Sequence, residues 1–598
     1  QARERDYAYA GSFYAFAIWI GMGVAGLYKL LSLALRKSLK KSKDKEDEEE
    51  EEVPTGKASS ALALIAVAFG IFVPLQMVSQ TWDDHDRSGR YACRDFGMNY
   101  LSSVEKNGII FSSGDNDTFP LWYAQEVEGW RTDVRVVNES YLSTDWYIAQ
   151  MSRPAYESEK LPMQATEETF AYNRRMWGIA YLYHQQPTPP TPATKAIADY
   201  YSPAINAQGG DEAKYPLFRY PNMFIPLDRE QIVRDGLVPA SHKSFVPDRL
   251  NVNLTEDKYF TGKDQEALSI SKTMTIDIVS KDIEDGWKRP VYFAMSMPDE
   301  YYSYFGNYMQ TSGMAYQVTP IDNRGYATVG AGFTDKAFSN ISEKFRWGGL
   351  DTATPENAPY CDETVSRMVN TTRTGILETV ANLVAEAEMA QEILDSDSLK
   401  AVYAELAVTP EFVADRYRKA KTLLLLSEEK LPEFAVPASF DLRDRTARYC
   451  YEVGKALGDK AMTQKGDEHI NRAIDCYAQY VRFCQKLDHN DWQRIGYIED
   501  YIFFKGGFLS LLVSYYESNP EGAKKKIEEL EKSGVKVWDN LYYAAIQTNA
   551  GNRDAVRNTF FGFQMLHDLM PERTMQFLEQ NEDCATAIAK LMGLMTGE

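Results

Sequence analysis

Two long runs of apolar residues stand near the start of the chain. The first extends from Phe13 to Leu35 with Lys29 as its single charge, and the second extends from Ala58 to Val78 without any charge. A helix needs roughly 20 apolar residues to cross the hydrocarbon core of a bilayer. The alternative, two buried core helices of a soluble protein, is less favoured because few such helices are apolar on every side. The pattern therefore predicts two transmembrane helices, at about 13–35 and 58–78.

The segment between the two runs, residues 36–57, carries the charges that set the orientation of the helices. Its basic residues are Arg36, Lys37, Lys40, Lys41, Lys43, Lys45 and Lys57. Loops rich in Lys and Arg stay in the cytoplasm, whereas the acidic block Glu46–Glu52 repels itself and is expected to be a disordered, solvated tip. Everything after Trp82 then faces outward. We expect a multi-pass protein of the bacterial cytoplasmic (inner) membrane, in contact with its lipid bilayer, with the large domain in the periplasm.

After the apolar runs the pattern changes to short alternating elements. Ala92–Ser103 is amphipathic and predicts a helix, and Gly108–Ser112 predicts a buried strand. A loop at 114–118 would cap a helix that begins near Phe119 and ends around residue 129, and residues 134–137 predict a second strand. A strand, a helix and a strand of these lengths form a βαβ unit with a parallel pair.

Two further strand signals follow, at Ser271–Val279 and Pro290–Ala294. The turn Trp287–Pro290 introduces the second one. Its basic pair beside a tryptophan has two interpretations, a site for a lipid phosphate or a sugar and a turn packed by its tryptophan, of which we favour the turn.

Helical patterns dominate after Asp362. Ile470, Ala473, Ile474, Tyr477 and Val481 follow the spacing of one buried helix face. Similar stripes run through residues 376–393, 501–516 and 542–569, with breaks at 519–522 and 549–552. Helix pairs of this kind predict a tetratricopeptide-like stack, although no repeat matches that consensus well.

Length, charge and composition narrow the class of protein. A chain of 598 residues exceeds one hydrophobic core. We expect a membrane-anchored α/β plus all-α protein, with the two helices and their linker at 1–81, an extracytoplasmic α/β domain at 82–361 and the helical domain at 362–598. The net charge of −21 argues against a nucleic acid partner. Six histidines and six cysteines are dispersed without metal-binding spacing or a hydrolase triad, so no metal centre and no catalytic residue is predicted.

Polar side chains gather where the predicted parallel strands end. Asp115 and Asp117 follow the first strand, and Asn138 and Glu139 follow the second. Ligands of open parallel sheets collect at the carboxyl ends of the strands, and Asp-x-Asp after an apolar strand is how many nucleotide-sugar glycosyltransferases hold a divalent metal. Asp and Asn are equally what a helix-capping loop requires. Asp115 and Asp117 are therefore candidate ligand-binding residues, with a divalent metal as one possible cofactor.

A second charged cluster follows the second apolar run. It consists of Asp84, His85, Asp86 and Arg87. Four consecutive ionisable residues cannot all turn toward one ion, but alternate ones share a face if the segment is extended. A metal or phosphate site and a solvated juxtamembrane turn with internal salt bridges are the two interpretations.

Several longer motifs resemble those of one known family. They are Arg3-Glu4-Arg5-Asp6-Tyr7, Gly11-Ser12-Phe13, Ile18-Trp19-Ile20-Gly21, the stretch 82–91, the stretch Gly114 to Tyr123 (GDNDTFPLWY), Gln125-Glu126-Val127-Glu128-Gly129, Arg131-Thr132-Asp133-Val134-Arg135, Thr144-Asp145-Trp146-Tyr147 and Trp287-Lys288-Arg289-Pro290. Over residues 1 to about 320 the chain resembles the DUF2723 family of Bacteroidota membrane proteins.

The resemblance implies a membrane glycosyltransferase of GT-C type that resembles protein O-mannosyltransferases. Such an enzyme takes a sugar from a polyprenyl-phosphate donor and attaches it to Ser or Thr of exported proteins, with an acidic residue in an early outer loop as the base. That loop would precede Gln1, so we expect this chain to be the C-terminal half of a longer protein and assign it no catalytic residue.

We therefore expect this portion to supply two membrane helices and an accessory domain that recognises an acceptor or a partner. The alternative function is a non-enzymatic, membrane-tethered periplasmic binding or scaffold protein that uses the helical stack as its platform.

Overall fold

The structure, a computed structural model, describes residues 6–41, 56–85, 88–166, 169, 179–182, 188–202, 217–256, 267–484, 507–549 and 553–596. These residues fall into two compact units, one made mainly by Gln1–Arg90 and the other by Tyr91–Cys361 with Val365–Glu598. Most regular elements are helices, and the strands form small sheets.

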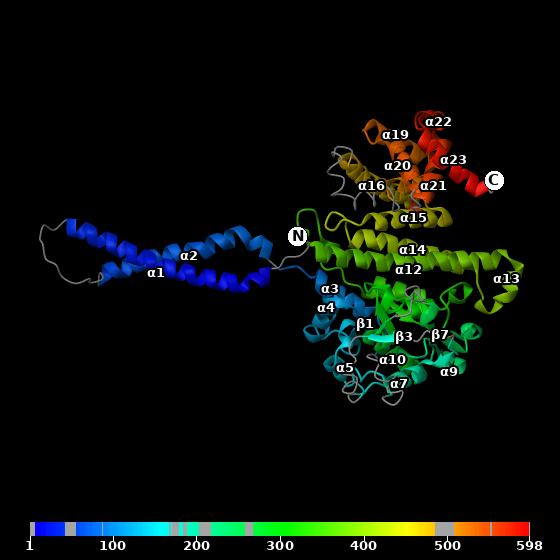
Figure 1. The fold of residues 1–598 in the computed structure, drawn as a ribbon, viewed down its shortest axis with the longest axis horizontal. Helices are drawn as coiled ribbons and strands as arrows, with labels where there is room; N and C mark the ends of the chain where they lie inside the picture. The colour runs from blue at the N-terminus through cyan, green and yellow to red at the C-terminus, as the bar shows by residue number, and fades with distance from the viewer. Residues whose placement is uncertain are drawn as a thin grey trace. The chain divides into compact units, whose positions relative to one another are not determined.

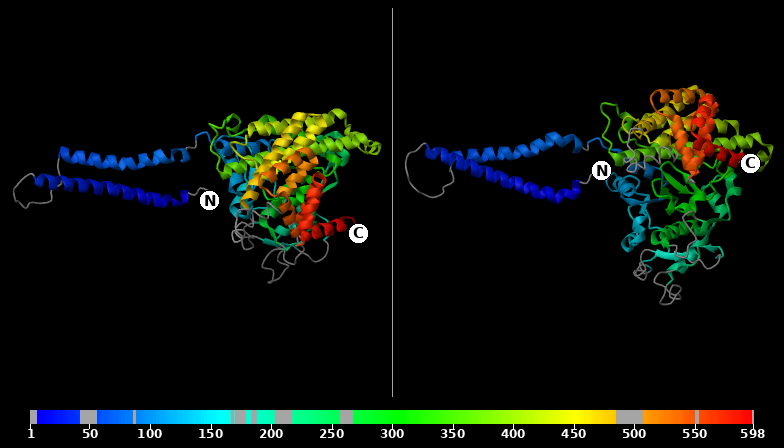
Figure 2. Two further views of the ribbon diagram at one scale, coloured as in Figure 1. Left: turned by 90° about the horizontal axis from the view of Figure 1, so that it is seen from above. Right: turned by 45° about the horizontal axis from the view of Figure 1, so that its top comes forward.

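The first unit is a pair of long helices that lie side by side, drawn in blue in Figures 1 and 2. A short 3-10 turn, Asp6–Tyr9, leads into α1 (Ala10–Lys41), and α2 covers Lys57–His85. The stretches Ala10–Ser38 and Lys57–Trp82 are long and apolar enough to cross a membrane, and only 6% of each apolar window is buried. The predicted pair of apolar helices is therefore confirmed. Helix α1 continues to Lys41 because Lys, Leu and Arg are strong helix formers.

The two helices approach each other closely at Gly70. A Cβ atom at this position would lie 2.5 Å from Cγ2 of Val24, so only glycine fits without a shift. Near the start of α2, the Ser59 hydroxyl shares a hydrogen bond of 2.6 Å with the Tyr28 hydroxyl from the middle of α1. Helix α2 continues through Pro74, as helices in membranes often do.

The second unit begins with the βαβ arrangement that the sequence predicts. Helix α3 (Ala92–Ser102) precedes β1 (Ile109–Ser112), which is followed by α4 (Gly114–Glu126) and β2 (Arg135–Asn138). Strands β1 and β2 are parallel, so the βαβ prediction is confirmed. The predicted loop at 114–118 is wrong. The chain turns at Gly114, whose φ of +71° suits glycine, and residues 115–117 already form the first turn of α4.

The main sheet has five strands in the order β10-β11-β9-β1-β2. Strand β9 (Val291–Ala294), which the sequence predicts, runs parallel to β1, while β11 (Ala315–Val318) and β10 (Met309–Thr311) add an antiparallel hairpin. The strand predicted at Ser271–Val279 is wrong, because this segment lies in helix α10 (Ile270–Glu284). The Ser269 hydroxyl accepts a hydrogen bond from the Lys272 amide and caps the helix.

Smaller elements complete the α/β part of this unit. Two three-stranded sheets have the orders β5-β3-β8 and β4-β6-β7. The elements are η2 (Ser140–Ser143), α5 (Asp145–Met151), β3 (Ile179–Leu182), β4 (Thr191–Pro192), α7 (Ala193–Tyr201), β5 (Leu217–Phe218), β6 (Asn222–Pro226), α9 (Arg229–Arg234), β7 (Arg249–Asn253), β8 (Ala267–Ser269) and α11 (Phe333–Ser339).

Helix α12 (Glu363–Asp395) joins the α/β part to the helical part. It packs on the β10–β11 hairpin so closely that a Cβ atom at Gly375 would lie 2.7 Å from the Gly313 carbonyl oxygen. The Asn382 amide also donates a hydrogen bond to the Thr311 hydroxyl. Buried side chains of the main sheet and of α12 belong to one continuous core.

After Asp362 every regular element in the described ranges is a helix, as predicted. The helices are α13 (Asp397–Val402), α14 (Pro410–Lys430), α15 (Phe440–Leu457), α16 (Lys460–Cys484), α18 (Phe508–Ser518), α19 (Pro520–Lys532), α20 (Val537–Asn549), α21 (Arg553–Leu569), α22 (Pro571–Gln580) and α23 (Glu582–Thr596), together with a short 3-10 turn at Ala404–Leu406. Figure 1 shows α12, α14 and α15 in successive layers, and the orange and red helices continue the array. A second core fills this region. The predicted stripe at 501–506 lies outside the described residues, and the likeness to tetratricopeptide repeats stays a prediction.

Candidate functional site

The carboxyl ends of three parallel strands meet at one edge of the main sheet. Strand β1 ends at Ser112, β2 at Asn138 and β9 at Ala294. Strand β2, which follows β1 in the chain, lies on one side of β1, and the later strand β9 lies on its other side. The connections therefore diverge between β1 and β9. In open parallel sheets this is the switch point, where a crevice forms and ligands bind.

Asp117 lies at this switch point. It sits in the first turn of α4, directly after β1, and the Ser296 hydroxyl, from the segment after β9, donates a hydrogen bond to its carboxylate. The Tyr100 hydroxyl of α3 lies 2.7 Å from Oγ of Ser296 and accepts a hydrogen bond from the Ser296 amide at 3.3 Å. A carboxylate only accepts hydrogen bonds. Tyr100, Ser296 and Asp117 therefore form a short relay of polar groups that links α3, the segment after β9 and α4.

Burial changes the ionisation of this relay. It raises the pKa of Asp117 to about 6, and the hydrogen bond from Ser296 opposes this effect. Burial also raises the pKa of the Tyr100 hydroxyl far above its usual range, and the negative charge of Asp117 adds to the rise. An acid with a pKa near neutrality can both accept and donate a hydrogen bond, which suits recognition of a ligand hydroxyl.

Glu139 is the second acid of this edge and follows β2 directly. Only 2% of the residue is exposed, and burial raises the pKa of its carboxyl, while a hydrogen bond from Ser271 and the charge of Lys272 oppose the rise. Its Oε1 atom is buried and has no hydrogen-bond partner in the described part of the chain. A buried acceptor without a partner costs about 1–3 kcal/mol, so this position is tuned for something other than stability.

A buried network of hydroxyls and an amide ties the two halves of the edge together. The Ser112 and Thr118 hydroxyls share a hydrogen bond of 2.8 Å, and the Asn138 amide donates to Thr118 at 2.9 Å. The backbone of Asn138 also takes part, since its backbone N–H donates to the Tyr147 hydroxyl at 2.8 Å. This network fixes where α4 begins relative to the end of β2.

The structure separates the two aspartates that the sequence proposes as a pair. Asp115 is exposed, whereas Asp117 is partly buried and turns to Ser296. Successive residues of a helix are about 100° apart around its axis. Two side chains that are two positions apart therefore point to opposite sides of the helix. Among the described residues no group of three or more His, Cys, Asp or Glu side chains forms a metal site. The geometry thus gives no support to a divalent metal between Asp115 and Asp117.

The other predicted cluster is only partly described. Asp84 and His85 form the end of α2, without description of their side chains, and Asp86 and Arg87 lie outside the described residues.

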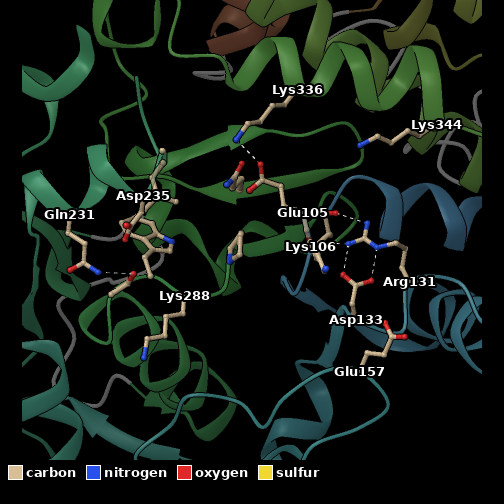
Figure 3. Close-up of a pocket in the computed structure, with 17 residues that line it drawn as sticks. Glu105, Lys106, Arg131, Asp133, Glu157, Gln231, Asp235, Lys288, Lys336 and Lys344 are labelled. Carbon is tan, nitrogen blue, oxygen red and sulfur yellow. Dashed lines mark hydrogen bonds and ion pairs between the residues drawn. The ribbon is translucent and has the colours of Figure 1, made fainter. Parts of the chain in front are cut away.

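A larger hollow of about 1060 Å³ lies at the opposite, amino end of the parallel strands and is drawn in Figure 3. Two pairs of its charged groups are held together by ion pairs. Arg131 holds Asp133 at 2.8 Å and also donates to the Leu101 and Val104 carbonyls, and Lys336 contacts Glu105 at 2.6 Å. These pairs lock the starts of the strands together.

The turn Trp287–Pro290 belongs to the same end of the sheet. Trp287 is buried and adopts a φ of +53°. Arg289 is also buried, and its guanidinium donates to the Asn107 and Glu159 carbonyls at 2.8 and 3.0 Å. Both side chains are used for packing and backbone contacts, so the turn packed by its tryptophan is the interpretation that the structure supports.

Sequence reasoning placed Asp117, Asn138 and Glu139 at this edge but missed Tyr100, Ser296 and Ser271. Ser296 lies 179 residues after Asp117, a separation counted directly from their numbers. No local pattern marks a single serine or tyrosine as a partner of a distant acid. The available signal was the second parallel strand, because residues that follow it must reach the same edge.

The fold and this edge define an α/β unit with a switch point at the carboxyl ends of its parallel strands, in a chain that also carries two helices apolar enough to cross a membrane. Residues 93–335 match the family model of TMEM260-associated domain 2, a family linked to membrane glycosyltransferase-like proteins. No curated protein and no solved structure matches the chain. The matched range contains the whole carboxyl edge and ends before α12.

Proposed function

We propose that the chain is the accessory portion of a membrane glycosyltransferase, and that its α/β unit recognises an acceptor or a partner outside the cytoplasmic membrane. The observation that carries the proposal is the match of residues 93–335 to TMEM260-associated domain 2, in the same chain as two exposed apolar helices. The basic residues between those helices support an outward orientation of the α/β unit by the positive-inside rule.

The resemblance to the DUF2723 family adds the finer parts of the proposal. The donor is a sugar linked to polyprenyl phosphate, and the acceptor is Ser or Thr of exported proteins, as in protein O-mannosylation. Catalysis is assigned to a part of the protein other than this chain. The two apolar helices anchor the chain in the inner membrane and hold the α/β unit in the periplasm. No catalytic role is given to Asp117 or Glu139.

The carboxyl edge supports a role in recognition. Asp117 and Ser296 place a carboxyl and a hydroxyl next to each other at this edge, and Glu139 adds a buried acceptor atom without a partner among the described residues. Such groups discriminate strongly between ligands with and without a hydroxyl, because a buried polar group that stays unpaired is costly. A Ser or Thr side chain of an acceptor segment supplies that hydroxyl.

Photo-crosslinking in intact cells tests the proposal. A benzoylphenylalanine placed at Asp115, which is exposed and two residues from Asp117, reports what contacts the carboxyl edge. Lys590, exposed on α23, is the matched control position. We expect exported proteins that carry O-linked sugars among the products at position 115 and not at position 590. Products of cytoplasmic origin at position 115 contradict the outward orientation.

A non-enzymatic membrane-tethered scaffold is the second candidate function. The continuous array from α12 to α23 favours it, because stacked helices present long surfaces to partner proteins. In the same experiment a scaffold gives partner proteins at position 590, and the products at position 115 carry no O-linked sugars.

A further inference from the structure

A cleft of about 760 Å³ lies beside β2, the edge strand of the main sheet. Its walls come from α4, from the segment η2–α5 and from the turn that follows α5. The size falls within the range of small-ligand pockets. None of the relay residues Tyr100, Ser296 and Asp117 belongs to its lining, so the cleft is separate from the carboxyl-edge site.

A row of aromatic side chains forms one side of the cleft. Phe119 and Trp122 stack with their ring centres 5.5 Å apart and their planes 23° apart. Trp122 lies 6.2 Å from Tyr141, and Tyr141 lies 5.8 Å from Trp146. Phe119 and Trp146 are 48% and 56% exposed. Aromatic rings that served packing alone would be covered, so these faces are available to a ligand.

Arg135, the first residue of β2, lines the same cleft and is 4% exposed. Its Nη2 atom donates to the carbonyls of Gln150 and Arg153 at 3.1 and 3.0 Å. Its Nε and Nη1 atoms are buried and have no hydrogen-bond partner in the part of the chain that the structure describes. A buried cationic donor left in this state is unfavourable unless an acceptor reaches it.

The other buried arginines in the described ranges differ in their charge partners, although the Nε atom of Arg416 also has no hydrogen-bond partner there. Each of them interacts with a carboxylate: Arg289 with Asp282, Arg373 with Glu433, Arg416 with Glu386, and Arg443 with Glu433. No carboxylate is among the groups that shift the pKa of Arg135, which burial lowers. Among the described residues no acid is thus shown to compensate the positive charge of Arg135, and an anionic group of a ligand is its natural partner.

Backbone strain marks one end of the cleft. Tyr156 has a φ of +53°, which is unfavourable for a bulky residue, and it is 65% exposed. Its hydroxyl donates a hydrogen bond to Glu126 at the end of α4. The strained turn thus holds an exposed ring at the cleft, and strain of this kind gathers at ligand-binding positions.

We propose that this cleft binds a saccharide that carries an anionic group, a carboxylate or a phosphate. The apolar C–H face of a sugar ring covers the exposed rings of Phe119 and Trp146 and the partly exposed ring of Trp122. Its hydroxyls meet polar groups such as Gln150 at the rim, and the anionic group reaches Arg135. The proposal rests on the cleft alone and goes beyond the proposed function, because it holds whether or not the chain serves a glycosyltransferase.

Calorimetric titration of the full chain in detergent micelles tests this assignment. The probes are trigalacturonate and glucose 6-phosphate as anionic saccharides, maltotriose and glucose as neutral ones, inorganic phosphate, and adenosine monophosphate. The variants are Trp146→Ala, Arg135→Gln and the matched control Tyr123→Ala, which removes an exposed ring of α4 that does not line the cleft. Arg135→Gln keeps one amide donor for the carbonyls of Gln150 and Arg153.

We expect at least one anionic saccharide to bind more tightly than its neutral counterpart and than phosphate. Trp146→Ala should weaken that binding by roughly tenfold or more, which corresponds to at least about 1.4 kcal/mol, and Tyr123→Ala should leave it unchanged. Arg135→Gln should remove the preference for the charged saccharide. If Arg135→Gln fails to fold, Trp146→Ala still decides, because its ring is exposed.

Three outcomes overturn the proposal. The first is absence of binding of both anionic saccharides at concentrations of about 10 mM. The second is binding that Trp146→Ala leaves intact. The third is binding of adenosine monophosphate in preference to both saccharides, which makes the cleft a nucleotide site.

Discussion

Replacement of the Asp117 carboxyl group tests the carboxyl-edge site most directly. Burial raises its pKa from 3.8 to about 6, so the folded protein holds a charge at neutral pH that it disfavours. In the Asp117→Asn variant the side chain cannot ionise, while its amide oxygen still accepts the hydrogen bond from Ser296. The variant should therefore be more stable than the wild type at neutral pH. The change lies in the site that we propose recognises ligands.

The size of this gain follows from the change in pKa. A rise from 3.8 to about 6 corresponds to about 3 kcal/mol, at 1.36 kcal/mol for each unit. The first turn of α4 favours a negative charge by up to about 1 kcal/mol, and partial exposure screens the charge further. We expect a net gain of about 2 kcal/mol for Asp117→Asn.

The sign of the pH dependence is specific. Below the unfolded pKa of 3.8 the carboxyl is protonated in both states, so the wild type loses nothing there. As the pH rises from about 4 through about 6, the unfolded state ionises first and the wild type loses stability. The melting temperature of Asp117→Asn should thus match that of the wild type near pH 4. By about pH 7.5 it should exceed the wild-type value by roughly 2–4 °C.

Thermal unfolding of the full chain in detergent between about pH 4 and pH 8 measures this difference. Asp115→Asn is the matched control, because it makes the same chemical change at an exposed position in the same helical turn. A constant difference for Asp117→Asn across the range, or a loss of stability at neutral pH, refutes the reasoning.

Three further predictions concern packing, charge and the anchor. Gly97→Ala should destabilise the protein by about 1–3 kcal/mol, because its Cβ would lie 2.2 Å from the Pro120 carbonyl oxygen; Gly306→Ala, with open space around it, should not. Chemical unfolding midpoints distinguish the two, and equal midpoints contradict the close approach of α3 and α4. Glu386→Ala should cost about 1–3 kcal/mol, because it removes the buried carboxylate that Arg416 contacts, while Asp335 still pairs with this arginine. Glu411→Ala, which breaks an exposed pair with Arg418, should cost at most about 1 kcal/mol, and calorimetry should separate them. Alkaline carbonate should leave the full chain in membranes and release a chain that begins at residue 91, and release of both contradicts anchoring by α1 and α2.

The strongest local patterns were read correctly from the sequence. The two apolar runs and the buried strand before Gly114 needed no tertiary information, because uniform hydrophobicity and a following turn residue define them. The parallel pairing of β1 and β2 followed from the length of the intervening helix.

Segment 271–279 shows where such reasoning fails. Its β-branched residues alternate with polar ones, which is typical of a strand. In the structure the segment is helical and buried on every side, so no single apolar stripe marks it as a helix. Asp277, the acidic residue of this segment, is buried and accepts hydrogen bonds from the Gln164 and Ala165 amides. Tertiary contacts therefore override the local propensity.

The candidate site divides in the same way. Asp117 and Glu139 were expected at the carboxyl edge because strand ends determine the position of the residues that follow. Their partners Ser296 and Ser271 come from distant segments, and the burial that raises both acidic pKa values depends on the assembled core. The separation of Asp115 from Asp117 also required the finding that α4 begins at Gly114.

The central claim is that this chain serves the glycosylation of exported proteins. Quantitative mass spectrometry of O-linked sugars on exported proteins tests it, in cells that lack the protein and in cells in which it is restored in wild-type form or as Asp117→Ala. The account predicts that the sugars disappear without the protein and return with the wild type. They should return only in part with Asp117→Ala at equal amounts of protein in the membrane. Undiminished sugars in cells that lack the protein contradict the account.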